Sequence, residues 1–312
     1  MSYQFHTVDV FTDRQFGGNQ LAVLPDARGL SVEQMHSITR EFNFSETVFV
    51  LPPENAANAR RIRIFTPGKE LPFAGHPTVG TAFVLAATGE IPLTGDETRI
   101  VLEEGVGPVD VLIKSSEGKP FFTELSAAKM PERGPGTYDR ETIARALSLA
   151  PEDIDADGPY SIEGFTAGVP FVFVPIRSLE ALGQARPKVE LFEKALGGSW
   201  SPDLYLFCER EESRSKNGIS NGDAVIQVRM FAPLLGVPED PATGSAAAAF
   251  AGYLARRSSR KEGTLRYTIH QGVEMGRPSM LLVGADIAGG AVQAVRVGGA
   301  SVLVCSGTLE LK

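Results

Sequence analysis

Hydrophobic residues occur along this chain mostly in short runs, with a few longer stretches that follow a helical period. The short runs are rich in β-branched and aromatic residues and end at Gly, Pro or polar clusters, as strands do. In the first half they lie at residues 6–11, 20–25, 46–51 and 61–65. Residues 31–43 instead carry apolar side chains three or four positions apart behind Ser31, a residue that favours a helix N-cap. The pattern predicts an α/β fold of many short strands and few helices.

The second half of the chain repeats the order of the first. Three segments return in sequence: GGNQLAVLP (17–25) as AGVPFVFVP (167–175), RIFTP (63–67) as RMFAP (229–233), and HPTVGTA (76–82) as DPATGSA (240–246). Matches in the same order, with slowly drifting spacing, indicate a tandem duplication of one α/β half. We therefore expect two similar halves, residues 1–129 and 130–312, with the last strand able to return to the first half.

In both copies the repeated segment predicts the start of a helix rich in small residues. His76–Pro77 leads one copy and Asp240–Pro241 leads the other. A helix N-terminus carries unpaired backbone N–H groups and roughly half a positive charge, so it favours a carboxylate or a developing enolate. If the halves pack with equivalent loops facing each other, the two N-termini would bind one anionic ligand between them. The alternative is two ordinary capped helices, with Asp240 as a plain N-cap.

Small residues accompany both helix starts. Gly75, Gly80 and Gly244, with the alanines at 246–249, are expected to let a ligand approach the backbone closely. Thr81 and Ser245 follow at equivalent places in the two copies.

Glu46 is the main candidate for acid–base chemistry. It leads the apolar run at 46–51, where burial would favour the protonated form of its carboxyl. Asp240, beside a helix N-terminus, is expected to stay ionised. Two carboxyl groups whose pKa values are shifted in opposite directions are the pattern expected when one moves protons and the other orients or polarises the substrate. The alternative for Glu46 is a strand end that faces solvent.

Composition narrows the functional class. The net charge of −8 argues against a general nucleic-acid binder and against binding to an anionic membrane surface. No apolar stretch reaches the length of a membrane span, and the first residues do not resemble a signal peptide. Two cysteines, Cys208 and Cys305, are too few for a disulfide framework and favour a reducing cytoplasm. The four histidines lack metal-ligand spacing, and no phosphate-binding glycine motif is present.

Five segments together resemble the signature segments of one family: FGGNQLAV (16–23), NFSETVFV (43–50), RIFTPGKELPFAGHPTVGTA (63–82), DPATGSAAAA (240–249) and HQGVEMGRPS (270–279). On these residues the chain resembles the phenazine-biosynthesis PhzF-like isomerases, from about residue 5 to about residue 309. The resemblance implies the diaminopimelate-epimerase-like fold. In that fold two pseudo-symmetric α/β halves each form a curved sheet around a central helix, with the active site in the cleft between the halves.

The resemblance also implies an activity and a set of site residues. In the epimerase relatives, two cysteines act on opposite sides of the cleft, and this sequence resembles the branch that lacks them. In that branch Glu46 would remove and redeliver a proton on a trans-2,3-dihydro-3-hydroxyanthranilate-like substrate. The substrate would be held or polarised by several residues: His76, Asp240, Ser245, Gly75, Gly244, Thr243, Asn19 and Pro77. No metal or organic cofactor would take part, and the protein would be a homodimer.

One position departs from the family pattern. Gln20 follows Asn19 where the family more often has proline, which would alter the wall of the pocket. The sequence therefore predicts a cofactor-independent isomerase for a small carboxylate-bearing substrate, and leaves that substrate open. The alternatives are an amino-acid racemase or epimerase, which needs two opposed acid–base groups, and a non-catalytic protein that binds small acids.

Overall fold

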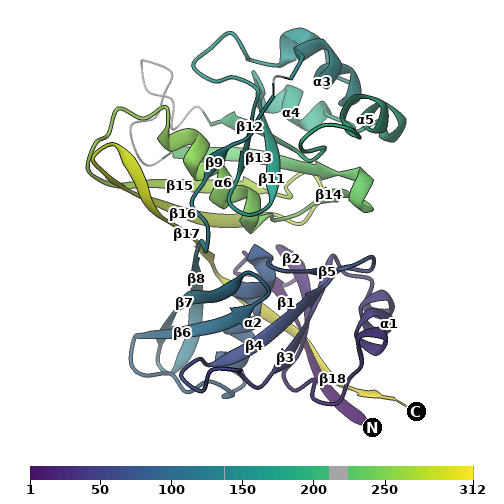
Figure 1. Ribbon diagram of the computed structural model, residues 1–312, viewed down its shortest axis with the longest axis vertical. Helices are drawn as coiled ribbons and strands as arrows, with labels where there is room; N and C mark the ends of the chain where they lie inside the picture. The colour runs from purple at the N-terminus through teal and green to yellow at the C-terminus, as the bar shows by residue number, and fades with distance from the viewer. Residues whose placement is uncertain (137, 211–223, 312) are drawn as a thin grey trace. The chain divides into compact units, whose positions relative to one another are not determined.

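The first and last strands of the chain lie side by side. In the computed structural model, which describes residues 1–136, 138–210 and 224–311, β1 (Ser2–Val10) pairs antiparallel with β18 (Ser301–Glu310). Residues 297–312 consequently form one unit with residues 1–128, and residues 129–296 form a second unit (Figure 1).

The strands of the first unit pair in a fixed order beyond β1. The remaining strands are β2 (Asn19–Leu24), β3 (Glu46–Leu51), β4 (Arg60–Phe65), β5 (Glu70–Leu71), β6 (Glu97–Glu104), β7 (Gly107–Ser116) and β8 (Lys119–Ser126). The pairs β2–β3 and β4–β6 are parallel, whereas β1–β2, β3–β4, β4–β5, β6–β7 and β7–β8 are antiparallel. Helix α1 (Val32–Phe42) connects β2 to β3, and the predicted Ser31 cap is confirmed because its side chain accepts a hydrogen bond from the Gln34 backbone N–H.

Helix α2 (Gly75–Ala87) is the central helix of this unit. Every residue from Gly75 to Ala86 is buried, and the helix contacts β1, β2, β7 and β8 (Figure 1). A helix that is apolar on all sides must be surrounded by other elements.

At Gly80, helix α2 packs directly against side chains of β1 and β2. A Cβ at this position would lie 2.6 Å from Val10 Cγ2 and 2.8 Å from Leu21 Cδ2. The expectation that Gly80 lets a ligand approach the backbone is therefore wrong, because side chains of β1 and β2 already occupy the space beside its Cα.

We expect Gly80→Ala to destabilise the protein. Alanine favours a helix interior over glycine, but here the added methyl overpacks the core, so the net loss in unfolding free energy should be about 1–2 kcal/mol. The matched control is Gly183→Ala, since a Cβ at Gly183 meets nothing within 4 Å. Denaturant unfolding should show the control to be neutral or stabilised. Equal stability of the two variants would contradict the packing role of Gly80.

The second unit repeats the pairing pattern of the first. Its strands are β9 (Glu132–Arg133), β10 (Glu163–Thr166), β11 (Pro170–Pro175), β12 (Leu204–Glu209), β13 (Ala224–Ala232), β14 (Val237–Asp240), β15 (Gly263–Gln271), β16 (Ser279–Ala288) and most of β17 (Ala291–Gly299). The pairs β11–β12 and β13–β15 are parallel, whereas β10–β11, β12–β13, β13–β14 and β15–β16 are antiparallel. This alternation matches that of β1 to β7, strand for strand.

Helix α6 (Gly244–Ala255) takes the place of α2 in the second unit, where it contacts β10, β11 and β16. The other helices are α3 (Arg140–Ala146), α4 (Leu179–Gln184), α5 (Val189–Leu196) and the 3-10 turns η1 (Pro151–Asp153) and η3 (Pro233–Leu235). Helices α3 to α5 bury a separate apolar cluster that includes Leu147, Phe192 and Leu204. The predicted fold class, two similar α/β halves each built around a central helix, is confirmed.

Candidate functional site

Glu46 and His76 lie next to each other in the first unit. Glu46 begins β3, and His76 is the second residue of α2. Glu46 Oε2 lies 3.4 Å from His76 Nε2, and the two side chains are 15 % and 5 % exposed. Glu46 is therefore a largely buried carboxyl beside a helix start, and not a strand end that faces solvent.

The other side of the His76 ring faces Asn19. The Asn19 side-chain nitrogen lies 3.2 Å from His76 Nδ1, and Asn19 is fully buried at the start of β2. Burial lowers the pKa of His76 to about 3, against a smaller opposite effect of a hydrogen bond with the Gln20 backbone. The imidazole is consequently neutral at neutral pH, with one donor and one acceptor nitrogen. The side chain that faces Glu46 is thus a neutral imidazole and not an imidazolium cation.

Asp240 occupies a turn in the second unit. It is the last residue of β14 and is 8 % exposed, whereas α6 begins only at Gly244, with Thr243 as its N-cap. The Thr243 hydroxyl donates a hydrogen bond to Asp240 Oδ2. The interpretation of Asp240 as a plain N-cap is therefore wrong, because Pro241 and the two residues after it form a turn between the carboxyl and the helix.

Gln271 holds this turn together and was not singled out by the sequence analysis. It is fully buried at the end of β15. Its Oε1 accepts a hydrogen bond from the Thr243 backbone N–H at 3.1 Å, and its Nε2 donates to the Asp240 carbonyl at 2.8 Å. The signal in the sequence is positional: Gln271 continues the inward-facing series of Leu265 and Ile269, where a polar residue needs buried partners.

Neither central helix has a side-chain cap at its N-terminus among the residues that the structure describes. The cap positions are Ala74 for α2 and Thr243 for α6, and neither side chain accepts a hydrogen bond from the first turn. The backbone N–H groups of a first turn have no partner within the helix. Both helix starts, including Gly75 and Gly244, can therefore donate to an anion.

The remaining predicted residues differ in accessibility. Pro77 is buried in the first turn of α2, and Ser245 is half-buried in the first turn of α6. Thr81, which takes the place of Ser245 in the repeat, is fully buried. The structure thus brings Asn19, Glu46 and His76 together in one unit, and groups Asp240, Thr243, Gly244 and Ser245 in the other.

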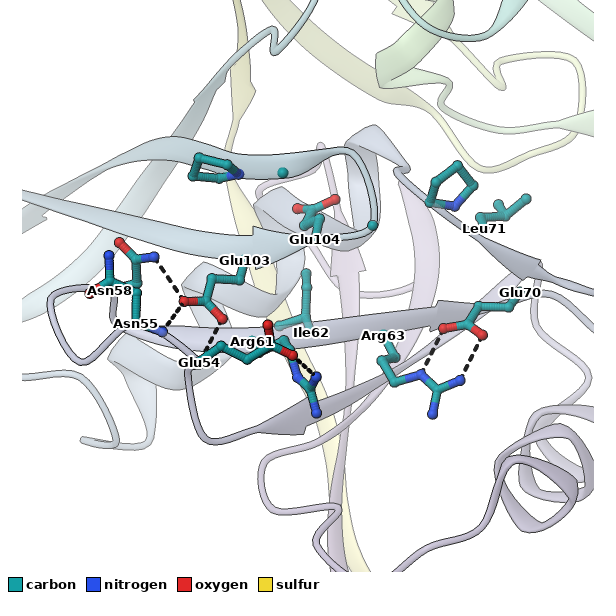
Figure 2. Close-up of a pocket in the computed structure, with 14 residues that line it drawn as sticks. Glu54, Asn55, Asn58, Arg61, Ile62, Arg63, Glu70, Leu71, Glu103 and Glu104 are labelled. Carbon is teal, nitrogen blue, oxygen red and sulfur yellow. Dashed lines mark hydrogen bonds and ion pairs between the residues drawn. The ribbon is translucent and has the colours of Figure 1, made fainter.

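A separate cavity of about 940 Å³ lies in the first unit, where β4 diverges from β6 (Figure 2). Two ion pairs, Arg61 with Glu54 and Arg63 with Glu70, lie along it. Neither Glu46 nor His76 is among its lining residues.

Within residues 1–136, 138–210 and 224–311, no group of three or more His, Cys, Asp or Glu side chains could hold a metal ion. Cys208 is buried on β12, and Cys305 is exposed on β18. No helix among the described residues is long and apolar enough to cross a membrane.

Comparison with known proteins gives consistent matches over nearly the whole chain. The model of a family described as phenazine biosynthesis-like protein (PhzC-PhzF) matches residues 8–307. An uncharacterized isomerase of Mesorhizobium japonicum is 40 % identical over 96 % of each chain. The trans-2,3-dihydro-3-hydroxyanthranilate isomerase of Pseudomonas aeruginosa is 36 % identical over 99 % of this chain and 100 % of its own. The crystal structure of a PhzF-family protein of Bacillus anthracis covers 100 % of both chains, with a TM-score of 0.85 and 24 % identity.

Proposed function

The chain belongs to the PhzC-PhzF family of phenazine biosynthesis-like proteins and is an isomerase, and we propose that it moves a proton on a small carboxylate-bearing substrate by acid–base catalysis. The observation that carries the proposal is the Glu46–His76 pair. A largely buried carboxyl lies 3.4 Å from a buried imidazole, at the start of a helix with no side-chain cap among the described residues. A carboxyl held in this way can both accept and return a proton.

In the proposed step Glu46 acts as the general base and then as the general acid. Its carboxylate takes a proton from a carbon of the substrate, and the C–H electron pair enters the adjacent unsaturated system. The acid proton of Glu46 exchanges with solvent, and Glu46 then delivers a proton to another carbon of that system, so the product is an isomer and no group is lost. His76, held by Asn19, polarises or orients the substrate beside Glu46.

We propose that the substrate carboxylate binds at the uncapped helix starts. Gly75 and Gly244 begin the two central helices, and their N–H groups have no acceptor within a helix. Asp240 orients or polarises the substrate, and Thr243, Ser245 and Pro77 complete the binding surface.

The name of the Pseudomonas aeruginosa relative supplies the substrate to test first, namely trans-2,3-dihydro-3-hydroxyanthranilate. Incubation of the protein with this compound in D₂O, followed by NMR and mass spectrometry, should show an isomer that has gained one deuterium. A racemase would scramble a stereocentre without shifting a double bond. A binding protein would exchange nothing, and that result with a set of related unsaturated acids would refute the proposal.

Catalysis without cysteine, metal or organic cofactor belongs to the same proposal, as does the prediction of a cytoplasmic homodimer. We expect iodoacetamide to alkylate the exposed Cys305 without loss of activity. Cys305 lies on β18, and β1 and β2 separate this strand from β3, which begins with Glu46. Activity should likewise survive dialysis against EDTA. The control is Cys305→Ser, which should behave as the alkylated enzyme does, and loss of activity on alkylation without unfolding would point to a thiol-based reaction.

A further inference from the structure

A second buried carboxyl lies beside the start of α2. Glu104 ends β6 and is 8 % exposed, and it lines the cavity shown in Figure 2. Its Oε1 lies 2.6 Å from Thr78 Oγ1. The same Thr78 hydroxyl lies 2.8 Å from the carbonyl oxygen of Ala74, the residue that precedes α2. Glu104 is thus connected through one hydroxyl to the first turn that contains Gly75 and His76.

Two acceptor oxygens, Glu104 Oε1 and the Ala74 carbonyl, lie within hydrogen-bond distance of the one Thr78 hydroxyl. Thr78 has one hydroxyl proton, and the Ala74 carbonyl can only accept. Each contact has a proton of its own when Glu104 is protonated and donates to Thr78 Oγ1, while the Thr78 hydroxyl donates to the Ala74 carbonyl. That carbonyl also accepts the Thr78 backbone N–H at 3.3 Å. Burial raises the pKa of Glu104 to about 8, against the lowering effect of the Thr78 hydrogen bond, so the carboxyl is protonated at neutral pH.

The charged groups near Glu104 do not compensate an ionised form. Arg61 of β4 pairs with Glu54, and Arg63 of β4 pairs with Glu70 of β5. Glu103, its neighbour on β6, accepts from the backbone N–H groups of residues 54 and 55. His76 of α2 is neutral at neutral pH. Among the described residues no cationic nitrogen lies within 4 Å of the Glu104 carboxyl.

We propose that Glu104 is a positioning residue for the start of α2. Its protonated carboxyl donates to Thr78, which fixes the Ala74 carbonyl and thereby the first turn that carries Gly75 and His76. The neutral form also leaves the positive end of the helix available to an anionic ligand, whereas an ionised Glu104 would place a competing negative charge there. This inference rests on the proposed function, in which that helix start binds the substrate carboxylate.

The protonation state of Glu104 can be tested without any ligand. The native protein keeps this proton up to about pH 8, whereas the unfolded chain loses it near the ordinary value of 4.5, so rising pH destabilises the native state between these limits. Glu104→Gln removes the effect. Its melting temperature relative to wild type should rise from pH 5 to pH 8 and then level off. The control is Glu97→Gln, at an exposed position of the same strand. A constant difference between Glu104→Gln and wild type would overturn the proposal.

The positioning role is tested by hydrogen–deuterium exchange of the amides at 75–79. Glu104→Ala and Thr78→Val should exchange about tenfold faster than wild type, because either change interrupts the chain to Ala74. Glu104→Gln should stay near wild type, since its amide can still donate to Thr78. Unchanged exchange in Glu104→Ala and Thr78→Val would overturn the proposal.

Binding of 3-hydroxyanthranilate, the aromatic analogue of the relative's substrate, connects Glu104 to function. The Kd of this probe should be about tenfold higher in Glu104→Ala than in Glu104→Gln at pH 7. Between pH 7 and pH 9 it should rise in wild type more than in Glu104→Gln, and equal pH profiles would overturn the electrostatic part of the proposal. A wild-type protein that binds no carboxylate probe would instead count against the proposed function, while the exchange and stability results still decide the role of Glu104.

Discussion

Glu46→Gln is expected to abolish proton exchange while leaving the fold and ligand affinity almost unchanged. Glutamine keeps the size and hydrogen-bonding reach of the side chain beside His76, but it cannot carry the transferred proton. General acid–base groups contribute about 100- to 10,000-fold to the rate, so the loss should appear in kcat and leave KM within a few-fold. Solvent-deuterium incorporation measures the transfer directly, and thermal unfolding measures the fold.

The control for this experiment is Glu41→Gln, an exposed glutamate of α1 in the same unit. It should exchange protons at the wild-type rate. A Glu46→Gln enzyme that also does so would show that Glu46 is not the base. A variant that loses activity and also has a lower melting temperature would instead show that Glu46 is needed for the stability of the fold.

Asp240→Asn should also inactivate the enzyme, with little change in stability. The asparagine oxygen can still accept the Thr243 hydrogen bond, and the Asp240 backbone carbonyl still receives Gln271. The negative charge that orients or polarises the substrate is lost. Removal of one such electrostatic contact typically reduces kcat by about 100-fold or more.

Asp240→Ala separates the structural contribution of this residue from the chemical one. It leaves the buried Thr243 hydroxyl without its acceptor, which should cost about 1–3 kcal/mol of unfolding free energy. If Asp240 only supports the turn, activity should follow stability, and the Asn variant should be active. If it acts on the substrate, both variants should be inactive although Asn is stable. A stable and fully active Asn variant would refute the catalytic assignment.

Two buried groups of the first unit give the unfolding free energy opposite dependences on pH. His76 is neutral in the native state and protonates in the unfolded chain, so its burial costs stability as pH falls below its ordinary value of 6.5. Glu104 costs stability as pH rises from 4.5 to about 8. His76 is the second residue of α2, and Glu104 at the end of β6 contacts Thr78 of the same helix. Both groups therefore lie beside the helix start at which the proposed function binds the substrate carboxylate.

The sequence by itself determined the duplicated α/β organisation and the candidate groups at the helix starts. Strand and helix periodicity is a local property, so the runs beginning at residues 6, 20, 46 and 61 and the helix behind Ser31 could be predicted from neighbouring residues alone. The repeat is likewise visible without coordinates. It directed attention to His76 and Asp240, and the apolar run behind Glu46 indicated a partly buried carboxyl.

Only the tertiary structure decided which groups meet and what each glycine and carboxyl contacts. Gly80 packs against β1 and β2, and Asp240 ends a strand several residues before α6, because both depend on contacts between segments distant in sequence. The roles of Gln271 and Glu104 cannot be recognised from residue type and position within a strand alone. These residues acquire a role because β15 and β6 end where a buried polar side chain finds partners in the turn before α6 and in the first turn of α2. The alternation along a strand can indicate that such a side chain faces inward, but the partners that offset its burial cost come from segments distant in sequence, which no local pattern encodes.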